Sequence, residues 1–533
     1  MAPSSTGEPQ AKRQKVCIQD KFRPGLFDKS FRDMLRNSIQ SSKPYPHCKV
    51  SNLIDQDLLR RVQQEIYKHL HFTTKETDIY KVNQTGDLAN LDGLSDLEQL
   101  RLPALRELRE ALSSDIFRNF VSDVTGCGAL SSTQMDMSVN TYTAGCHLLN
   151  HDDVIGTRRV SFILYMPDEP WYPSDGGALE LYPVTERDTP ANEPTVSVPP
   201  EWNQFCMFTV LPGYSFHSVE EVVAEEKRRL SIQGWFHFPQ EGEDGYVEQS
   251  VIGIPSLQQI EKPLDAQQEP FCEYTTELTA TLTKEDREIL ADWINPDYLK
   301  AEFLTKISDK FIEDSAVQLK KFLKEELWQE IATATLEADR CDGLTDGKMP
   351  PHGVGVRGNW FVQGPPVSQR FLRLSNESHK EEKTSNIFQR LRSFLETDTF
   401  RRWLAVVSDL EPKGYRGMAR RFRPGHDFTL ATMHQKNRPF LDVTLCLASQ
   451  EAEKWESCEY GGYECYMAAG EEENDDPATY RSSDEGVLLT IPAGSNELSI
   501  VLRDEGVIRF IKYVSARAPG ARWDIAYEFD LAA

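Results

Sequence analysis

The sequence lacks paired cysteines. Its ten cysteines are scattered from Cys17 to Cys465, and none lies in a C-x-x-C pair. Several lie within apolar runs, such as Cys206 in FCMF and Cys446 in TLCLA. This usage argues against a disulfide framework and a zinc ribbon, and it is typical of reduced, buried thiols in an intracellular protein.

Long apolar runs and an excess of positive charge are also missing. No run approaches the roughly 18 apolar residues of a membrane span, and residues 1–16 lack the apolar segment of a secretory signal. The 533 residues include 59 Lys and Arg against 84 Asp and Glu, a net charge of −25. Because such a chain repels phosphates, we expect no direct nucleic-acid or membrane partner. The charge permits basic partners such as ribosomal proteins or histones, although taken alone it favours the simpler interpretation that acidity serves solubility.

The chain does contain enough apolar sequence for two or three domains. Hydrophobic residues make up 39% and aromatic residues 10%, as in globular domains with substantial cores. We predict that residues 1–25 form a disordered tail. Its basic cluster, Lys12-Arg13-Gln14-Lys15, is typical of a nuclear address. We therefore expect the protein in the nucleus and the cytoplasm.

Hydrophobic periodicity predicts helices first and strands afterwards. Apolar residues recur at helical spacing in 53–72 and 104–121, within a region from about 50 to 122 that we expect to be helical. From 133 onward, short β-rich segments separated by Gly, Pro and Asp favour an antiparallel sandwich or jelly roll.

A second group of helices is predicted after a loop-rich stretch. Thr283 is expected to cap a helix that has acids in its first turn. A longer helix is predicted through 315–331. Its apolar stripe would consist of Leu319, Phe322, Leu323 and Leu327.

The β-rich segments of the first half recur in the second. HLLNHDD, RRVSFILYM, GGALELY, FTVLPGYSFHSV and RRLSIQGWF are followed later by FRPGHDFTL, RPFLDVTLCL, GGYECYM, LLTIPAGSNELSIVL and RWDIAYEF. The pairs Gly176-Gly177 and Gly461-Gly462 correspond. We therefore predict two similar β domains supported by helices, at 26–245 and 281–533, joined by a linker at 246–280.

A polar turn in the first half predicts a metal site. Carboxylates and imidazoles at the edge of a hydrophobic core destabilise the fold unless they are paired or bind a metal. Since residues two apart in a strand face one way, His151 and Asp153 would point together, with Asp152 as the alternative carboxylate. His217, at the end of a later strand-like run, would be the third ligand. Two histidines and one carboxylate form the facial triad of non-haem Fe(II) oxygenases, whose open positions can take a 2-oxo acid and dioxygen.

A 2-oxoglutarate cosubstrate needs a partner for its far carboxylate, and arginine is best suited to that task. Arg229 lies twelve residues after His217 and shares a strand face with Ser231, whereas Arg228 faces away. Tyr165, at the end of the strand after the metal turn, can donate a hydrogen bond to the same carboxylate.

Two other histidines near these segments receive different interpretations. His147 is four residues before His151, and we interpret it as structural. His237 follows the last strand of the first half, and we expect it at the surface.

The segments HDDVIGTRRVSFILYM, GGALELYP, LPGYSFHSVEEV and RRLSIQGWFHFP closely resemble the fungal and animal prolyl 3,4-dihydroxylases. These 2-oxoglutarate- and Fe(II)-dependent oxygenases modify a small-subunit ribosomal protein. The resemblance covers most of the chain and implies two double-stranded β-helix domains, so the implied fold is mainly β with packing helices. It also implies iron ligands and cosubstrate contacts. The implied residues are His151, Asp153 and His217 for iron, and Arg229, Tyr165 and Tyr142 for 2-oxoglutarate, with Ser231 beside Arg229.

The resemblance also implies a reaction and its partners. A prolyl residue would be hydroxylated at C3, and in some members also at C4, with ascorbate keeping the iron reduced. Effects on translation termination or fidelity would follow, with translation-termination factors or transcription regulators as partners. The alternative is an oxygen-sensing binding protein that controls a partner's stability or transcription. Monomer and homodimer both stay open.

The second half departs from the catalytic pattern. His426-Asp427 is followed by Phe428, so the H-x-D spacing is lost. PAGSNELSIV, which we match with PGYSFHSV, has no histidine, although Arg522 survives in ARWDIAYE. We expect a degenerate, non-catalytic copy that serves stability, dimer contact or partner binding.

Overall fold

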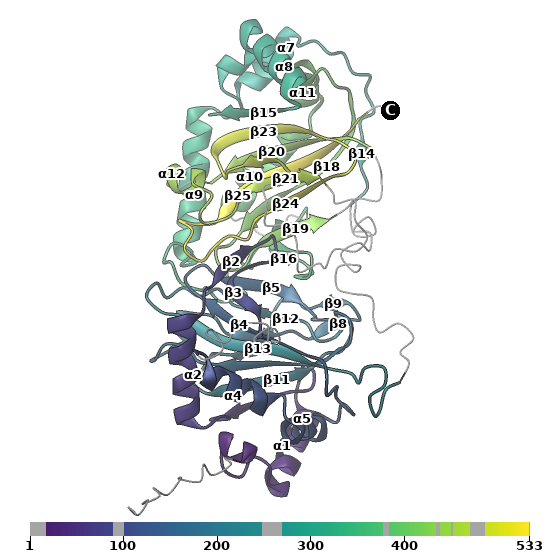
Figure 1. Cartoon of the computed structure of the whole chain (residues 1–533). Coiled ribbons are helices and arrows are strands. Elements are labelled where there is room, and N and C mark those ends of the chain that lie inside the picture. The colour runs from purple at the N-terminus through teal and green to yellow at the C-terminus, as the bar shows by residue number, and fades with distance from the viewer. Residues whose placement is uncertain are drawn as a thin grey trace, which may run out of the picture.

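The computed structural model contains two large antiparallel β-sheets, one from each half of the chain (Figure 1). It describes residues 17–88, 101–247, 269–376, 383–432, 438–448, 451–468 and 486–531. These residues do not include the basic cluster at 12–15, most of the predicted linker at 246–280 or the acid-rich segment 469–485. Among the described helices, none has the length and apolar character that a bilayer crossing requires.

The first sheet is built from strands between 47 and 237. In spatial order these are β1 (His47–Ser51), β11 (Gln204–Thr209), β6 (Arg158–Tyr165), β13 (Arg229–His237), β4 (Met135–Tyr142), β3 (Tyr80–Asp87), β5 (His147–His151), β12 (His217–Val219), β7 (Leu179–Leu181) and β10 (Val196–Val198), with β2 (Thr73–Glu76) beside β3. A separate hairpin joins β8 (Val184–Glu186) and β9 (Thr189–Pro190).

Helices cover one side of the first sheet. They are η1 (Ile18–Lys21), α1 (Lys29–Ser41), α2 (Gln56–His69), α4 (Pro103–Leu112) and α5 (Asp115–Thr125), and a short η3 (Pro173–Asp175) lies in a later loop. In α2 the buried residues Leu58, Leu59, Val62 and Ile66 recur at helical spacing. They belong to the same core cluster as Val160, Phe162 and Leu164 of β6. The sheet side chains on the opposite face are therefore available for a site.

The second sheet is built from strands between 272 and 531. In spatial order these are β15 (Ala316–Lys320), β23 (Ser495–Arg503), β20 (Phe440–Leu447), β25 (Arg522–Leu531), β18 (Pro412–Phe422), β17 (Gln369–Leu374), β19 (Phe428–Thr432), β24 (Val507–Ile511), β21 (Glu464–Ala468) and β22 (Val487–Ile491), with β14 (Cys272–Glu273) beside β18 and β16 (Trp360–Gln363) beside β17. Its helices are α7 (Lys284–Ala291), η5 (Pro296–Leu299), α8 (Ala301–Asp314), α9 (Glu325–Cys341), α10 (Lys383–Leu395), α11 (Asp398–Ser408) and α12 (Ala452–Glu456).

The two sheets share one strand order, and matching residues hold matching turns. Asn203 has a left-handed backbone with φ of 57°, and its side chain bonds both the N–H (3.0 Å) and the carbonyl (2.6 Å) of Ile54. Asn496, also at φ 57°, bonds the N–H (2.8 Å) and the carbonyl (3.1 Å) of Leu323. The same strand-to-helix connection is thus clamped in the same way in both halves.

The glycine pairs noted in the sequence also correspond in space. Gly176 and Gly461 both have positive φ, and a Cβ at either would clash with a carbonyl oxygen, that of Glu221 or of Tyr513. Only glycine allows both the left-handed backbone and the close approach. Together with the strand order, this confirms the predicted fold class of two double-stranded β-helix domains with packing helices.

Several predicted elements differ from the observed ones. The segment 315–331 is not one helix: β15 comes first and α9 begins only at Glu325. Val317 and Leu319 are buried while Gln318 is exposed, which is the alternation of a strand. Likewise, β2 and β3 lie within the region that we expected to be helical.

The prediction of a disordered tail over 1–25 is wrong for its last residues. Residues 18–21 form η1, and the Phe22 ring stacks on Phe117 at 4.9 Å between ring centroids. Phe22, within the span predicted to be a disordered tail, is therefore part of the core of the first half. By contrast, Thr283 caps α7 as predicted, since its hydroxyl accepts a hydrogen bond from the N–H of Asp286 at 3.1 Å.

Buried polar contacts join the two halves. The Glu221 carboxylate accepts hydrogen bonds from the Ser515 hydroxyl (2.6 Å), the Ala516 N–H (2.6 Å) and the Tyr513 hydroxyl (3.2 Å). Nε2 of His352 lies 2.7 Å from Oε1 of Glu180. The wall of the first domain nearest the predicted metal site is therefore fixed against the second domain.

Candidate metal centre

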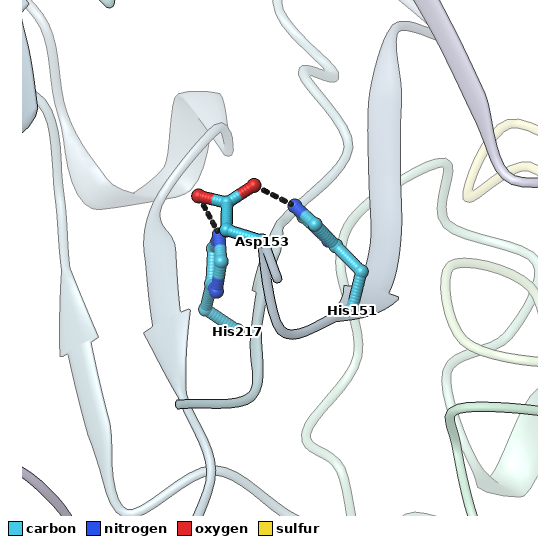
Figure 2. A group of neighbouring side chains, drawn as sticks. All are labelled: His151, Asp153 and His217. Carbon is cyan, nitrogen blue, oxygen red and sulfur yellow. Dashed lines mark ion pairs between the residues drawn. The ribbon is translucent and has the colours of Figure 1, made fainter. Parts of the chain in front are cut away.

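The turn after β5 brings the three predicted metal ligands together. His151 ends β5 and pairs directly with His217 of β12. Asp153 lies beyond the strand, with a left-handed φ of 62°. The turn, rather than strand alternation, therefore folds its carboxylate back over the two imidazoles, as Figure 2 shows.

The geometry of these side chains suits a divalent cation. Oδ1 of Asp153 lies 3.4 Å from Nε2 of His151, and Oδ2 lies 3.3 Å from Nε2 of His217 (Figure 2). One ligand atom from each of the three residues lies within 4.8 Å of the others. Two imidazole nitrogens and one carboxylate oxygen are the donor set of a facial triad.

Backbone carbonyls fix the tautomers of both histidines. Nδ1 of His151 lies 2.8 Å from the carbonyl oxygen of Leu149, and Nδ1 of His217 lies 2.9 Å from that of Ser215. Because a carbonyl can only accept, Nδ1 is the donor in each ring. With Nδ1 protonated, Nε2 is the atom that faces Asp153, and in the neutral imidazole its lone pair would be available to a metal ion.

The electrostatics favour an ionised carboxylate at this centre. Burial acts to raise the pKa of Asp153, but the charge of His217 and hydrogen bonds from both histidines outweigh it and hold the pKa well below its usual range. Burial acts to lower the pKa of His151, yet Asp153 raises it overall. A buried carboxylate that needs cationic neighbours is a good ligand for a metal ion.

Trp235 orients the carboxylate and was missed by the sequence analysis. Its indole N–H donates a 2.9 Å hydrogen bond to Oδ2 of Asp153. The guanidinium of Arg158 lies over the indole, 3.6 Å from the ring centroid. Trp235 occupies the same face of β13 as Arg229 and Ser231, so strand alternation was the signal that could have found it.

Asp152, the alternative carboxylate, has a different task. Its Oδ1 accepts a hydrogen bond from the N–H of Val154 (3.2 Å), and its Oδ2 accepts one from the N–H of Gly213 (3.3 Å). It is fully buried and ties the metal turn to the loop that leads to His217. It does not belong to the cluster of three candidate ligands.

The predicted cosubstrate residues surround one buried guanidinium. Arg229 donates from Nε to the carbonyl of Gly177 (2.6 Å) and from Nη2 to the Tyr165 hydroxyl (3.3 Å). Its guanidinium lies 4.7 Å from the ring centroid of Tyr142 and 4.9 Å from that of Tyr165. The nearby Ser231 hydroxyl is buried and has no hydrogen-bond partner among the described residues.

This arrangement fits the far carboxylate of 2-oxoglutarate. Arg229 is 0% exposed, and no carboxylate of the described residues forms an ion pair with it. A buried charge without a counter-charge is costly, so an anionic ligand is expected beside it. The unpartnered Ser231 hydroxyl adds a donor for the same anion.

A cavity of about 330 Å³ opens on the metal centre. The three candidate ligands and Tyr142 line it, and the Tyr142 ring in turn contacts the Arg229 guanidinium. Other lining residues were not predicted. Among them are Asn140 and Asn150, whose side chains carry buried polar atoms without described partners, and Val367 and Leu430, which come from the second domain.

The two other histidines interpreted from the sequence, His147 and His237, do not belong to the metal cluster. His147 is buried against Tyr513, with ring centroids 4.1 Å apart. The prediction that His237 is a surface residue is wrong: it is 3% exposed, and its Nε2 lies 3.1 Å from Oδ2 of Asp136. As the last residue of β13 it is still covered by the core.

The strand pairing corrects our match between the halves. His217 pairs with Leu181 in the first sheet, and at the corresponding point of the second sheet Arg509 pairs with Tyr466. The counterpart of the second histidine is thus Arg509, and it does not lie in PAGSNELSIV. The same pairing places Thr432, the partner of Arg509, where His151 stands.

His426-Asp427 is likewise not the counterpart of the metal turn. It precedes β19, whereas the metal turn follows β5. Asp427 forms hydrogen bonds with the Arg423 guanidinium at 2.8 and 2.9 Å, and Nε2 of His426 donates to the Pro350 carbonyl (2.7 Å). The counterpart of Asp153 falls within 433–437, outside the described residues.

The arginine of the cosubstrate site is retained in the second half but neutralised there. Arg522 donates to the carbonyl of Gly462, as Arg229 does to that of Gly177. Its Nε also lies 3.0 Å from Oδ2 of Asp524. An internal carboxylate therefore satisfies the charge that is left unpaired in the first domain.

Comparisons with known proteins agree with this geometry. Residues 137–237 match the 2OG-Fe(II) oxygenase superfamily, and residues 285–533 match the family described as oxoglutarate and iron-dependent oxygenase degradation C-term. The chain is 36% identical over 516 residues to prolyl 3,4-dihydroxylase OGFOD1 of Ostreococcus tauri, covering 95% of this chain and 99% of the relative.

A more distant relative and one solved structure extend the comparison. Prolyl 3-hydroxylase OGFOD1 of Mus musculus is 29% identical over 542 residues, covering 89% of this chain and 85% of the relative. A Pseudomonas putida prolyl-4-hydroxylase is 21% identical with a TM-score of 0.27, covering 38% of this chain and 98% of its own.

Proposed function

Because this chain belongs to the family of 2-oxoglutarate- and Fe(II)-dependent prolyl 3-hydroxylases and 3,4-dihydroxylases, we propose that its substrate is a prolyl residue of a small-subunit ribosomal protein. The chain is a 2-oxoglutarate-dependent prolyl hydroxylase that uses Fe(II). The ribosomal substrate and hydroxylation at C3, with C4 as a second position, are the proposal. The cluster of His151, Asp153 and His217, together with the unpaired charge of Arg229, carries the hydroxylase chemistry. The net charge of −25 supports a basic protein as the substrate.

In this proposal each residue has a definite task. His151, Asp153 and His217 would hold Fe(II) on one side and leave the opposite side open to the cavity. Arg229 and Ser231 would bind the far carboxylate of 2-oxoglutarate. Fe(II) with 2-oxoglutarate supplies the oxidising chemistry that places an oxygen atom from O2 on a C–H bond.

The chain itself contributes positioning and exclusion of water. The Tyr165 hydroxyl and the Tyr142 ring keep the Arg229 guanidinium in one orientation. Trp235 keeps the Asp153 carboxylate turned toward the two histidines. Val367 and Leu430 extend the cavity wall from the second domain, so a bound peptide would meet both halves of the chain.

Charge supports a basic protein substrate. The net charge of −25 would draw a basic ribosomal protein toward the enzyme and would repel free nucleic acid. We further propose that ascorbate sustains turnover by keeping the iron reduced, and that the modification affects translation termination or fidelity. The Lys12-Arg13-Gln14-Lys15 cluster supports a nuclear pool beside a cytoplasmic one.

Mass spectrometry of ribosomal proteins tests the substrate. We expect one prolyl residue of a small-subunit protein to gain one or two oxygen atoms in cells with the wild-type chain. In cells with the His217→Ala chain that residue should stay unmodified. Identical small-subunit spectra from the two cell lines would refute the ribosomal substrate but not the prolyl hydroxylase chemistry.

A further inference from the structure

The second domain retains a cavity at the position of the catalytic one. This second cavity has a volume of about 190 Å³ and lies among β17, β18, β19, β23, β24 and β25. In the first sheet Asn140 pairs with Gln84 on one side and with Ser231 on the other. In the second sheet Arg420 pairs in the same way with Arg373 and Asp524.

Arginine has replaced uncharged or metal-binding residues around this second cavity. The strand pairing shows which positions of the two sheets are equivalent. Arg420 is equivalent to Asn140, Arg373 to Gln84 and Arg509 to His217. All six of these residues line their respective cavities. Among the described residues, the second domain has thus lost both metal histidines, while its cavity has become lined with guanidinium groups.

The counter-charges of these arginines lie largely behind the wall. Five arginines line the second cavity, namely Arg373, Arg416, Arg420, Arg503 and Arg509, whereas the lining acids are Glu269 and Glu528. Asp442, Glu464 and Asp524 pair with lining arginines but do not themselves line the cavity. These three acids are at most 1% exposed. The cavity therefore presents positive charge.

Among the described residues, the charges around this cavity do not balance. With Arg522, which pairs with Asp524, the network has six arginines against the five carboxylates already named. Arg420 uses Nε (2.7 Å) and Nη2 (3.0 Å) on Asp524, and no described residue accepts a hydrogen bond from its Nη1. A guanidinium has five N–H donors, so capacity for a further oxyanion remains.

We propose that this second cavity binds a small organic anion, whose carboxylate or phosphate group is held by Arg420, Arg503 and Arg509. Phe371, Met418 and Ile511 line the cavity as well and suit a short apolar body. The volume equals that of about six liquid waters, so the ligand is a small molecule. An anion there would neutralise the surplus positive charge.

The second cavity shares a wall with the catalytic one. Leu430 of β19 lines both cavities, and its neighbour Thr429 lines the second cavity. Leu430 is 2% exposed and packs in one cluster with Leu149 of β5 and Tyr513. A bound anion is therefore separated by one strand from the site where the substrate proline must lie.

A pair of matched variants tests the proposal. Ala526 lines the second cavity at the position that Gln233 occupies in the catalytic one, so Ala526→Phe and Gln233→Phe fill one cavity each. Isothermal titration calorimetry on the full chain would use succinate and inorganic phosphate as separate probes. We expect at least one probe to bind the wild type and Gln233→Phe, and to bind Ala526→Phe at least tenfold more weakly.

The two probes distinguish a carboxylate ligand from a phosphate ligand. If Ala526→Phe does not fold, the double variant Arg420→Gln/Asp524→Asn removes the guanidinium together with its partner and should show the same weakening. Absence of binding by the wild type to both probes would overturn the proposal. So would equal binding by the wild type and the second-cavity variants. Because these variants leave His151, Asp153 and His217 intact, such a failure says nothing against prolyl hydroxylation.

Discussion

Arg509 occupies in the second sheet the position that His217 occupies in the first. Arg509 pairs with Tyr466 across the second sheet, and His217 pairs with Leu181 at the equivalent point of the first sheet. A guanidinium has no lone pair for a metal and carries a positive charge, so this single replacement removes a ligand and repels the cation. The two domains share a topology but differ in their capacity to bind iron.

One iron per chain is therefore expected. Metal analysis of the purified chain should give a ratio near one for the wild type and near zero for His217→Ala. The control is His71→Ala, which alters an exposed histidine and should keep its iron. A ratio near two, or iron retained by His217→Ala, would contradict the assignment of the metal site.

Replacement of Trp235 by Phe should weaken iron binding without unfolding the protein. The variant keeps the apolar bulk but loses the N–H that orients Asp153. Loss of such an outer hydrogen bond reduces metal affinity by roughly 10- to 100-fold. Titration of Fe(II) against succinate formation measures the change, and excess iron should restore much of the rate. Trp202→Phe, which alters an indole bonded to Gln56 instead, is the matched control.

Replacement of Arg229 by Lys should raise the KM for 2-oxoglutarate. An ammonium group cannot form two parallel hydrogen bonds to a carboxylate, so we expect an increase of about tenfold or more. Initial rates over a range of 2-oxoglutarate concentrations provide the measurement. Arg228→Lys is the control, because Arg228 is exposed and bonds Asp168. An equal KM in the wild type and Arg229→Lys would remove Arg229 from the cosubstrate site.

Glu220→Gln should stabilise the protein at alkaline pH. Burial, together with the charges of Glu180 and Glu221, raises the pKa of Glu220 from 4.5 to about 8, although the Ala178 N–H acts to lower it. The folded chain therefore holds a proton that the unfolded chain releases, and stability falls as pH rises from about 4.5 to 8.

The variant removes this loss because glutamine does not ionise. Thermal unfolding should show a gain of a few kcal/mol, about 5 at most, at pH above about 8 and little change near pH 4. Glu226→Gln, at an exposed neighbouring position, is the control. A gain that is equal at both pH values would mean that ionisation of Glu220 is not its cause.

The sequence alone was sufficient for residues whose chemistry follows from a short local pattern. Alternation in one strand correctly placed Arg229 and Ser231 on a common face, and both are fully buried. It also grouped His151 with Asp153, although for the wrong geometric reason. Their convergence depends on the left-handed backbone of Asp153, which no side-chain pattern encodes.

Other features depend on pairing between distant strands. Val317 and Leu319, followed by Phe322 and Leu323, mimic a helical stripe, and only the pairing of β15 with β23 identifies a strand. The equivalence of Arg509 and His217 was missed because it follows from pairing across the sheet rather than from similar letters.

The most direct test of the account is hydroxylation in a defined mixture under 18O2. The purified chain, Fe(II), 2-oxoglutarate and small-subunit ribosomal proteins are incubated together, and the products are digested for mass spectrometry. We predict that one prolyl residue gains 18O with the wild-type chain and none with Asp153→Ala. Formation of succinate without any labelled proline would contradict the central claim.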